Sequence, residues 1–176
     1  MSDPLEALKY PVGPMPRQSS PLEARERAAL IDVIERTPAR IRTLVRGLTE
    51  AQLDTPYRPG GWTIRQVVHH VPESHMHAYI RMKLAVTEPA PLVKTYEEQL
   101  WAELSDARGP VEMSLNLLDA LHVRWVSFLR TLPEAEFRKT FKHPGWGTVC
   151  VEEALGMYAW HCRHHAAHIE NALARV

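Results

Sequence analysis

The 176-residue chain has only two cysteines, no net charge and no long uninterrupted apolar run. Cys150 and Cys162 form neither a CxxC pair nor a disulfide framework, which fits a reducing compartment. Basic and acidic residues number 21 each, so the chain lacks the basic excess with which proteins neutralise a nucleic-acid backbone. The apolar runs fall short of the ~18 residues that a membrane span needs, and Met1–Pro4 lacks the plan of a signal peptide. These absences predict a cytoplasmic protein without a nucleic-acid or membrane partner.

The chain is long enough to bury its own core, and no low-complexity spacer divides it. Residues 1–20 are rich in proline and serine, and Tyr10–Pro14 cannot propagate a helix. We therefore predict an extended N-terminal arm over residues 1–20, packed on a single helical domain over residues 21–176.

Four helices are expected in that domain, which makes the fold class all-α, a four-helix bundle. The first begins around Ser20, Pro21 and Glu23, a capping-box pattern, and Pro38 should kink or split it. Thr63 and Gln66 form a similar start for the second. The predicted ranges are 21–47, 63–86, 111–131 and 151–175.

The connection over residues 88–110, between the second and third helices, is too long for a simple turn. We expect a crossover that roofs a pocket, with Tyr96 and Trp101 in it. A weak internal repeat links residues 48–62 with residues 132–146, since both stretches end in proline, glycine and tryptophan. Because each copy lies between two expected helices, the repeat suggests two similar helical hairpins that face each other.

The chain contains ten histidines, and four of them lie close together in the last helix. An advance of about 100° per residue from Tyr158 places the apolar side chains within about 60° of it. His161 lies about 60° and His165 about 20° from Tyr158, inside this stripe, whereas His164 lies about 120° away and points out of it. His168, at about 80°, lies on its edge. Only His161 and His165 are therefore an inward-facing pair one turn apart.

On the second helix the same count places His70 on the flank of the buried stripe and His69 on the opposite side. His75 also faces inward, although the bend expected at Pro72 affects every later position. His70 is therefore the third inward histidine, on a helix that can face the last one.

Two imidazoles one helical turn apart can chelate one ion, and a third from a facing helix completes a three-point site. We predict one divalent transition metal ion per chain on His70, His161 and His165. His75 and His168 are candidates for hydrogen-bonding partners of these ligands. The alternative is a set of hydrogen-bonded core or surface histidines, which we expect for His69, His77, His122, His143 and His164.

Several segments, spread over nearly the whole length of the chain, together resemble the YfiT branch of the DinB-like superfamily. They are residues 8–13, 57–70, 74–76, Tyr96, 101–104, 158–161 and 164–169. The resemblance implies a four-helix bundle, usually dimeric, in which three histidines hold nickel or zinc, in a family described as metal-dependent hydrolases. The family's ligand positions match His70, His161 and His165. Pro72 and Glu73 stand where relatives commonly have a small residue and an aspartate, so no acid–base role is transferred to that position.

Three neutral imidazoles leave a divalent ion its full charge, which lowers the pKa of a bound water from about 15.7 towards 7. We therefore expect an enzyme that hydrolyses a small-molecule substrate with a metal-activated water. The chain has no HExxH motif to supply a base, so the catalytic residues stay unknown. The acids placed to act as a base are Glu73, Glu97, Glu98 and Glu103, and none is assigned a role.

Two other functions are compatible with the same residues. Other DinB-like branches bind a low-molecular-weight thiol at the metal, so a bacillithiol-type S-transferase is one alternative. A non-catalytic metal-binding module is the other. A homodimer is expected from the family and from the apolar seam that such a bundle often exposes.

Overall fold

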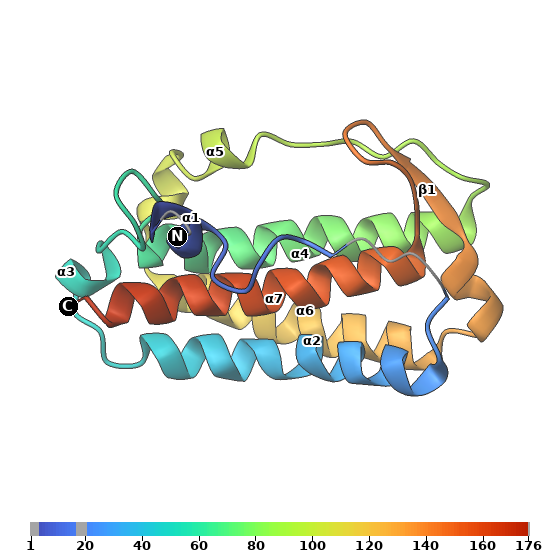
Figure 1. The fold of residues 1–176 in the computed structure, drawn as a ribbon, viewed down its shortest axis with the longest axis horizontal. Helices are drawn as coiled ribbons and strands as arrows, with labels where there is room; N and C mark the ends of the chain where they lie inside the picture. The colour runs from blue at the N-terminus through green and yellow to red at the C-terminus, as the bar shows by residue number, and fades with distance from the viewer. Residues whose placement is uncertain (1–3, 17–20, 176) are drawn as a thin grey trace.

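The computed structural model describes residues 4–16 and 21–175, and four long helices form its body (Figure 1). In chain order the helices and strands are α1 (Pro4–Lys9), α2 (Ala24–Val45), α3 (Glu50–Leu53), α4 (Ile64–Thr87), α5 (Glu98–Trp101), the 3-10 helix η1 (Ser105–Arg108), α6 (Val111–Thr131), the 3-10 helix η2 (Glu134–Arg138), β1 (Thr140–His143), β2 (Gly147–Cys150) and α7 (Val151–Leu173). The predicted four-helix bundle is thus confirmed, with α2, α4, α6 and α7 as its members. None of the helices in the described ranges is both long and apolar enough to cross a membrane.

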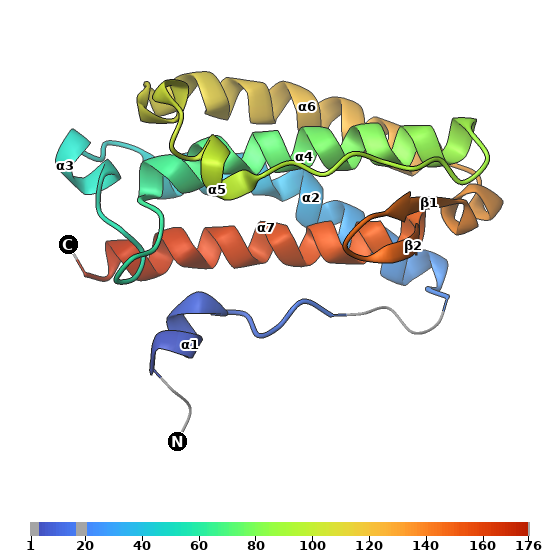
Figure 2. The same cartoon turned by 90° about the horizontal axis from the view of Figure 1, so that it is seen from above.

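The four long helices are not arranged as two hairpins. Helices α2 and α4 each pack against both α6 and α7, so α2 and α4 lie diagonally across the bundle. The connection after α4 runs back along the whole bundle before α6 begins, as predicted for a crossover (Figures 1 and 2). The hairpin interpretation of the repeat was therefore wrong, because periodicity defines the buried face of a helix but not the neighbour that covers it.

The helix starts follow their capping residues. Thr63 caps α4 as predicted, since its hydroxyl accepts a hydrogen bond from the Gln66 backbone N–H at 3.1 Å and the Gln66 side-chain oxygen accepts one from the Thr63 backbone N–H at 3.0 Å. At α2 the cap is Glu23, which pairs with Glu26 in a capping box, so the helix begins three residues after Pro21. The predicted cap, Ser20, lies outside the described residues.

Both internal prolines lie within continuous helices, so the split predicted at Pro38 does not occur. Proline lacks an N–H group, which leaves the carbonyl four residues earlier without its helical donor. For Pro38 that carbonyl belongs to Ile34, and the Nδ1 atom of His122 lies 2.7 Å from it. The side chain of a neighbouring helix thus replaces the missing backbone hydrogen bond.

The N-terminal arm is only partly extended, because its first described part forms α1. Pro4 suits the first position of a helix, the residues after it are good helix formers, and Pro11 excludes continuation. The arm lies along α7, where the indole N–H of Trp160 donates to the Gly13 carbonyl at 3.1 Å (Figure 2). The prediction of a wholly extended arm missed this short helix.

A β-hairpin that the all-α prediction missed precedes α7. Strands β1 and β2 pair antiparallel, with Phe141 opposite Val149 and both side chains buried. The crossover joins this hairpin through the Val93 N–H, which donates to the Lys142 carbonyl at 3.0 Å. Each strand has only four residues, too few for alternation to identify a strand reliably.

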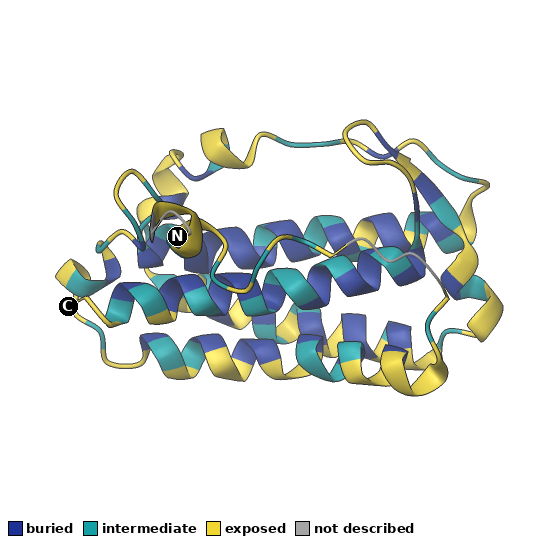
Figure 3. Ribbon diagram, viewed as in Figure 1, coloured by how far each residue is buried: buried dark blue, intermediate teal, exposed yellow. Residues whose placement is uncertain are grey.

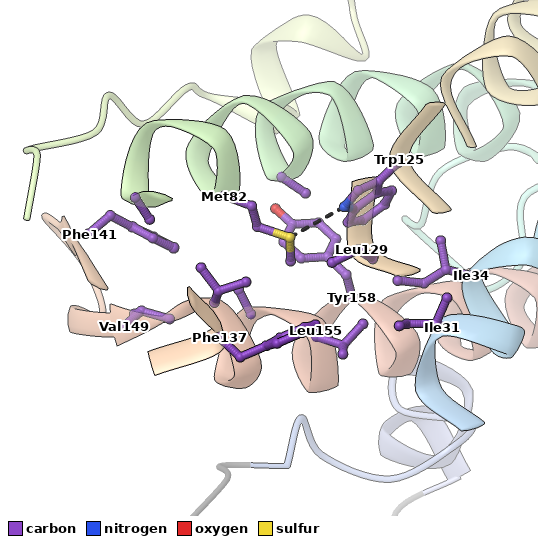
Figure 4. Close-up of a cluster of buried hydrophobic side chains, with 14 of the residues drawn as sticks. Ile31, Ile34, Met82, Trp125, Leu129, Phe137, Phe141, Val149, Leu155 and Tyr158 are labelled. Atoms are coloured by element: carbon purple, nitrogen blue, oxygen red, sulfur yellow. Dashed lines mark hydrogen bonds between the residues drawn. The ribbon is translucent and has the colours of Figure 1, made fainter. Parts of the chain in front are cut away.

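Buried residues recur along all four long helices (Figure 3). The buried apolar side chains form two clusters, one towards each end of the bundle. The cluster near the hairpin contains Trp125, whose indole N–H lies 3.3 Å from the sulfur of Met82 (Figure 4). On α4, Val71 belongs to one cluster and Ala78 to the other, and His75 lies between them. A layer of buried histidines therefore separates the two clusters.

Candidate metal centre

The three predicted ligands come together between α4 and α7. One nitrogen from each of His70, His161 and His165 lies within 4.8 Å of the other two. The Nε2 atoms of His70 and His161 are 3.3 Å apart. Two ligands at about 2.0–2.1 Å from a tetrahedral zinc ion are separated by about 3.3 Å, so this spacing fits a shared ion. The residues present therefore fit a divalent metal ion.

A chain of hydrogen bonds fixes the orientation of the His161 ring. The Ile34 carbonyl can only accept, so the His122 Nδ1 atom beside it must carry a proton and its Nε2 atom must accept. His75 then donates from Nδ1 to His122 Nε2 at 2.8 Å, and its own Nε2 accepts from His161 Nδ1 at 3.0 Å. The Nε2 atom of His161 is left without a proton, as a metal ligand requires, and the Ser74 hydroxyl lies 3.4 Å from it.

His165 is held in the same way from the opposite side. The Nε2 atom of His168 lies 3.2 Å from the Lys9 carbonyl and therefore donates to it. His168 Nδ1 can then accept from His165 Nδ1, 3.4 Å away, which leaves the Nε2 atom of His165 free. His75 and His168 thus hydrogen-bond to the proposed ligands, as expected from the sequence. Each of the two series of hydrogen bonds ends at a backbone carbonyl.

Burial keeps these imidazoles neutral near pH 7. Loss of solvent lowers the pKa of His70 to about 3, with a smaller effect from His168. The pKa values of His161 and His165 are also well below the ordinary value, first through burial and then through the neighbouring histidines. The Nδ1 atom of His70 is buried without a hydrogen-bonding partner. Neutral rings with free Nε2 lone pairs are the form that binds a metal.

A cavity of about 560 Å³ opens over the three histidines. Its walls come from the arm, the loop before α4, the crossover, the hairpin, and helices α4 and α7. The crossover roofs it with Thr95, Tyr96, Glu98 and Gln99, as the length of that connection suggested. The site is thus a pocket large enough for a small-molecule substrate.

The remaining histidines have other partners. His69 is buried on the far side of α4 between the Ser114 hydroxyl, at 2.7 Å, and the Gly109 carbonyl, at 3.1 Å. His164 was expected to point outward, yet it is buried because the arm covers it, with its ring stacked on Trp160. His77 stacks on Tyr96 in the crossover, and His143 stacks on Trp146 in the hairpin. His122 belongs to the hydrogen-bonded chain described above.

Of the four acids considered as a base, only Glu98 lines the cavity. Burial raises the pKa of Glu73, which lies near Asp106 and away from the cavity wall. The sequence interpretation missed Ser74 and Arg81, which share the cavity with the histidines. Their spacing was a usable signal, because positions four and eleven residues after His70 lie within about 40° of it on a helix.

The fold and the cavity define a four-helix bundle protein with three convergent histidines at a solvent-accessible pocket. A family model described as the DinB superfamily matches residues 34–169, and the chain belongs to that superfamily.

Relatives with assigned names match almost the whole chain. A Bacillus cereus protein named "Putative metal-dependent hydrolase" is 47% identical over 169 residues, 96% of this chain and 97% of its own. A similarly named protein of Bacillus mycoides is 52% identical over 146 residues, 83% of this chain and 84% of its own.

Two solved structures are similar. YfiT from Bacillus subtilis, described as "a probable metal-dependent hydrolase with an unusual four-helix bundle topology", has a TM-score of 0.92 and 43% identity over 96% of this chain and 97% of its own. The four-helix bundle protein TT2238 has a TM-score of 0.54 and 19% identity, covering 85% of this chain and 99% of its own, which supports the fold alone.

Proposed function

We propose that the protein is a metal-dependent hydrolase in which His70, His161 and His165 hold one divalent ion, zinc or nickel, for action on a small-molecule substrate. The observation that carries the proposal is the convergence of three neutral imidazoles at a cavity. In particular, hydrogen bonds to backbone carbonyls leave the Nε2 atoms of His161 and His165 free to bind. The names of the relatives also favour hydrolysis over thiol transfer or a non-catalytic role.

When bound, such an ion lowers the pKa of water towards 7 and polarises a carbonyl, which supports hydrolysis of an amide or ester. The protein's own residues supply orientation and a water-excluding wall. His75 and His168 hold two of the ligand rings in position, and Trp62 packs against the ring of His70 with centroids 4.6 Å apart. A preformed site of this kind lowers the entropy cost of binding.

The first test is the metal content of the purified protein, measured by plasma mass spectrometry after incubation with zinc and with nickel. We expect about one ion per chain in the parent and almost none in a His161→Ala/His165→Ala variant. A His69→Gln variant is the matched control, because His69 is also a buried histidine and lies next to His70 on α4, but it lies outside the cavity. It should retain the parent's metal content, while circular dichroism verifies that both variants are folded.

A parent protein that binds neither ion would contradict the metal centre. Bound metal together with no turnover of any ester or amide in a substrate screen, with and without chelator, would contradict hydrolysis while leaving the metal centre intact. The two parts of the proposal are therefore tested separately.

We also propose that the protein acts as a homodimer in the cytoplasm. The support is α6, where the apolar side chains of Met113, Leu117 and Val123 are 61%, 42% and 73% exposed. Large apolar side chains exposed along one helix are typical of contact surfaces. One chain has a mass of 20.1 kDa, and light scattering on the parent should give twice this value. A Val123→Glu variant should give a mass closer to that of a single chain. A monomeric parent would contradict the proposal.

A further inference from the structure

A buried cationic side chain, Arg81, lines the cavity at some distance from the three histidines. Arg81 lies on α4 and is only 5% exposed. Eleven residues separate it from His70, which is about 16 Å of helical rise and places both on one face of α4. Because helical side chains lean towards the N-terminus, the guanidinium extends back in the direction of the histidines.

Arg81 has no acidic partner in the part of the chain that the structure describes. Its Nη2 atom donates to the Lys94 carbonyl at 2.8 Å, and its Nε atom is buried without any partner. A buried charge of this kind costs several kcal/mol unless an opposite charge compensates for it. Arg81 therefore lacks a counter-charge that a buried guanidinium normally has.

The two other buried arginines show the difference. Arg27, which is 8% exposed, contacts Glu152 at 2.9 Å and Glu134 at 3.3 Å. Arg65, which is 5% exposed, pairs with Asp54 at 2.7 Å and also with Glu50. Arg81 is as deeply buried as these two, yet it faces the cavity instead of a carboxylate.

The surroundings of Arg81 suit an anion. The cavity wall includes the hydroxyl-bearing side chains of Ser74, Tyr96 and Tyr158, which can donate to a carboxylate. Burial raises the pKa of Tyr158, so its hydroxyl stays protonated near pH 7, although Arg81 and Ser74 oppose the increase. Among the residues that the structure describes, the ionised side chains that line the cavity are Lys9, Arg58, Arg81 and Glu98. Three of these four are cationic and one is anionic, so the field in the cavity favours an anionic ligand.

We propose that Arg81 binds a carboxylate of the substrate while the bond to be hydrolysed lies at His70, His161 and His165. This inference rests on the proposed function and names its substrate class, an amide or ester with a free carboxylate elsewhere in the molecule. The planar guanidinium has five N–H donors and matches a carboxylate in a two-point contact. The length of helix between the two groups sets an upper limit of about 16 Å on the distance between the carboxylate and the reacting bond.

The test uses monohydroxamates of straight-chain dicarboxylic acids of increasing length, in which the hydroxamate binds zinc and the far end bears a free carboxylate. Isothermal titration calorimetry on the zinc-loaded protein compares each acid with its methyl ester. At the best chain length the parent should bind the acid about tenfold more tightly than the ester. In Arg81→Gln the acid and the ester should bind equally, and the ester's affinity should stay at the parent's value.

Arg58→Gln is the matched control, because Arg58 also lines the cavity and also has a buried, unpartnered Nε atom. It should retain the preference for the acid. Equal binding of acid and ester by the parent would overturn the assignment to Arg81. An equal loss of the preference for the acid in both arginine variants would also overturn it.

A second measurement does not depend on the metal. In the metal-free protein, glutarate should shift the NMR signal of the Arg81 Nε–H group, which is identified by its absence in Arg81→Gln. If the hydroxamates fail to bind while this signal shifts, the metal-dependent function is wrong and the carboxylate site stands. If glutarate leaves the signal unchanged, the carboxylate site is wrong.

Discussion

A proline and three histidines connect the proposed metal centre to the first long helix. Pro38 leaves the Ile34 carbonyl without a backbone donor, and His122 uses that carbonyl to fix its own tautomer. The proton positions of His75 and His161 follow from this one contact, since each ring must donate where the previous one accepts. The orientation of His161, a proposed ligand, thus depends on His122, which does not line the cavity.

We predict that His122→Leu weakens zinc binding about tenfold, because His75 then no longer has an acceptor that fixes its tautomer. Competition with a chromophoric chelator measures the affinity. His69→Gln is the control, since His69 is similarly buried but hydrogen-bonds only to Ser114 and Gly109. Unchanged affinity in His122→Leu would show that the chain of hydrogen bonds does not support the ligand.

The first turns of two long helices, α2 and α7, are joined by a buried ion pair. Arg27 donates to Glu152 at 2.9 Å and to the Leu22 carbonyl at 2.6 Å, while Glu152 accepts from the Leu22 backbone at 2.9 Å. The carboxylate also lies in the first turn of α7, where the helix dipole favours a negative charge. These contacts hold the start of α2 against the start of the helix that carries two of the proposed ligands.

Arg27→Met should lower the free energy of unfolding by about 3–5 kcal/mol, because it leaves the Glu152 carboxylate buried and unpaired. The exposed pair Arg40–Glu170, which is nearly half exposed on both sides, is the control. Arg40→Met should cost less than about 1 kcal/mol. Urea unfolding measures the free energy of unfolding of both variants. Similar decreases in the two would contradict the claim that burial makes the Arg27–Glu152 pair more important for stability than an exposed pair.

For the whole molecule, the layer of neutral histidines between the two apolar clusters should make stability sensitive to acid. Burial lowers the pKa of His122 to about 4, whereas in the unfolded chain it is about 6.5. As the pH falls below 6.5 the unfolded chain binds the proton first, so the folded state loses stability until the pH reaches about 4. The protonation of His122 in the unfolded chain accounts for a decrease of up to about 3 kcal/mol in the free energy of unfolding.

Urea unfolding of the metal-free protein at pH 7 and pH 5 should therefore show a clear loss of stability at the lower pH. His122→Leu should reduce that difference by about 2 kcal/mol, since leucine does not titrate. The same pH dependence in the parent and the variant would mean that folding does not lower the pKa of His122.

The sequence by itself determined the features that depend on local spacing. The ranges of the long helices, the Thr63 cap, the crossover and the inward direction of His70, His161 and His165 all follow from periodicity, capping chemistry and the length of the connections. These depend on contacts one helical turn apart or on the angle between positions on one helix. Each of these features can therefore be predicted from one stretch of sequence, without knowledge of how the helices pack.

Other features were decided only by the tertiary structure, because they depend on which segments meet. The diagonal placement of α2 and α4, the covering of His164 by the arm and the use of the Ile34 carbonyl by His122 join residues far apart in the chain. The lack of a counter-charge at Arg81 is also invisible in a sequence whose net charge is zero. Periodicity gives the direction of each side chain from its own helix, whereas its partner depends on how the helices pack against each other.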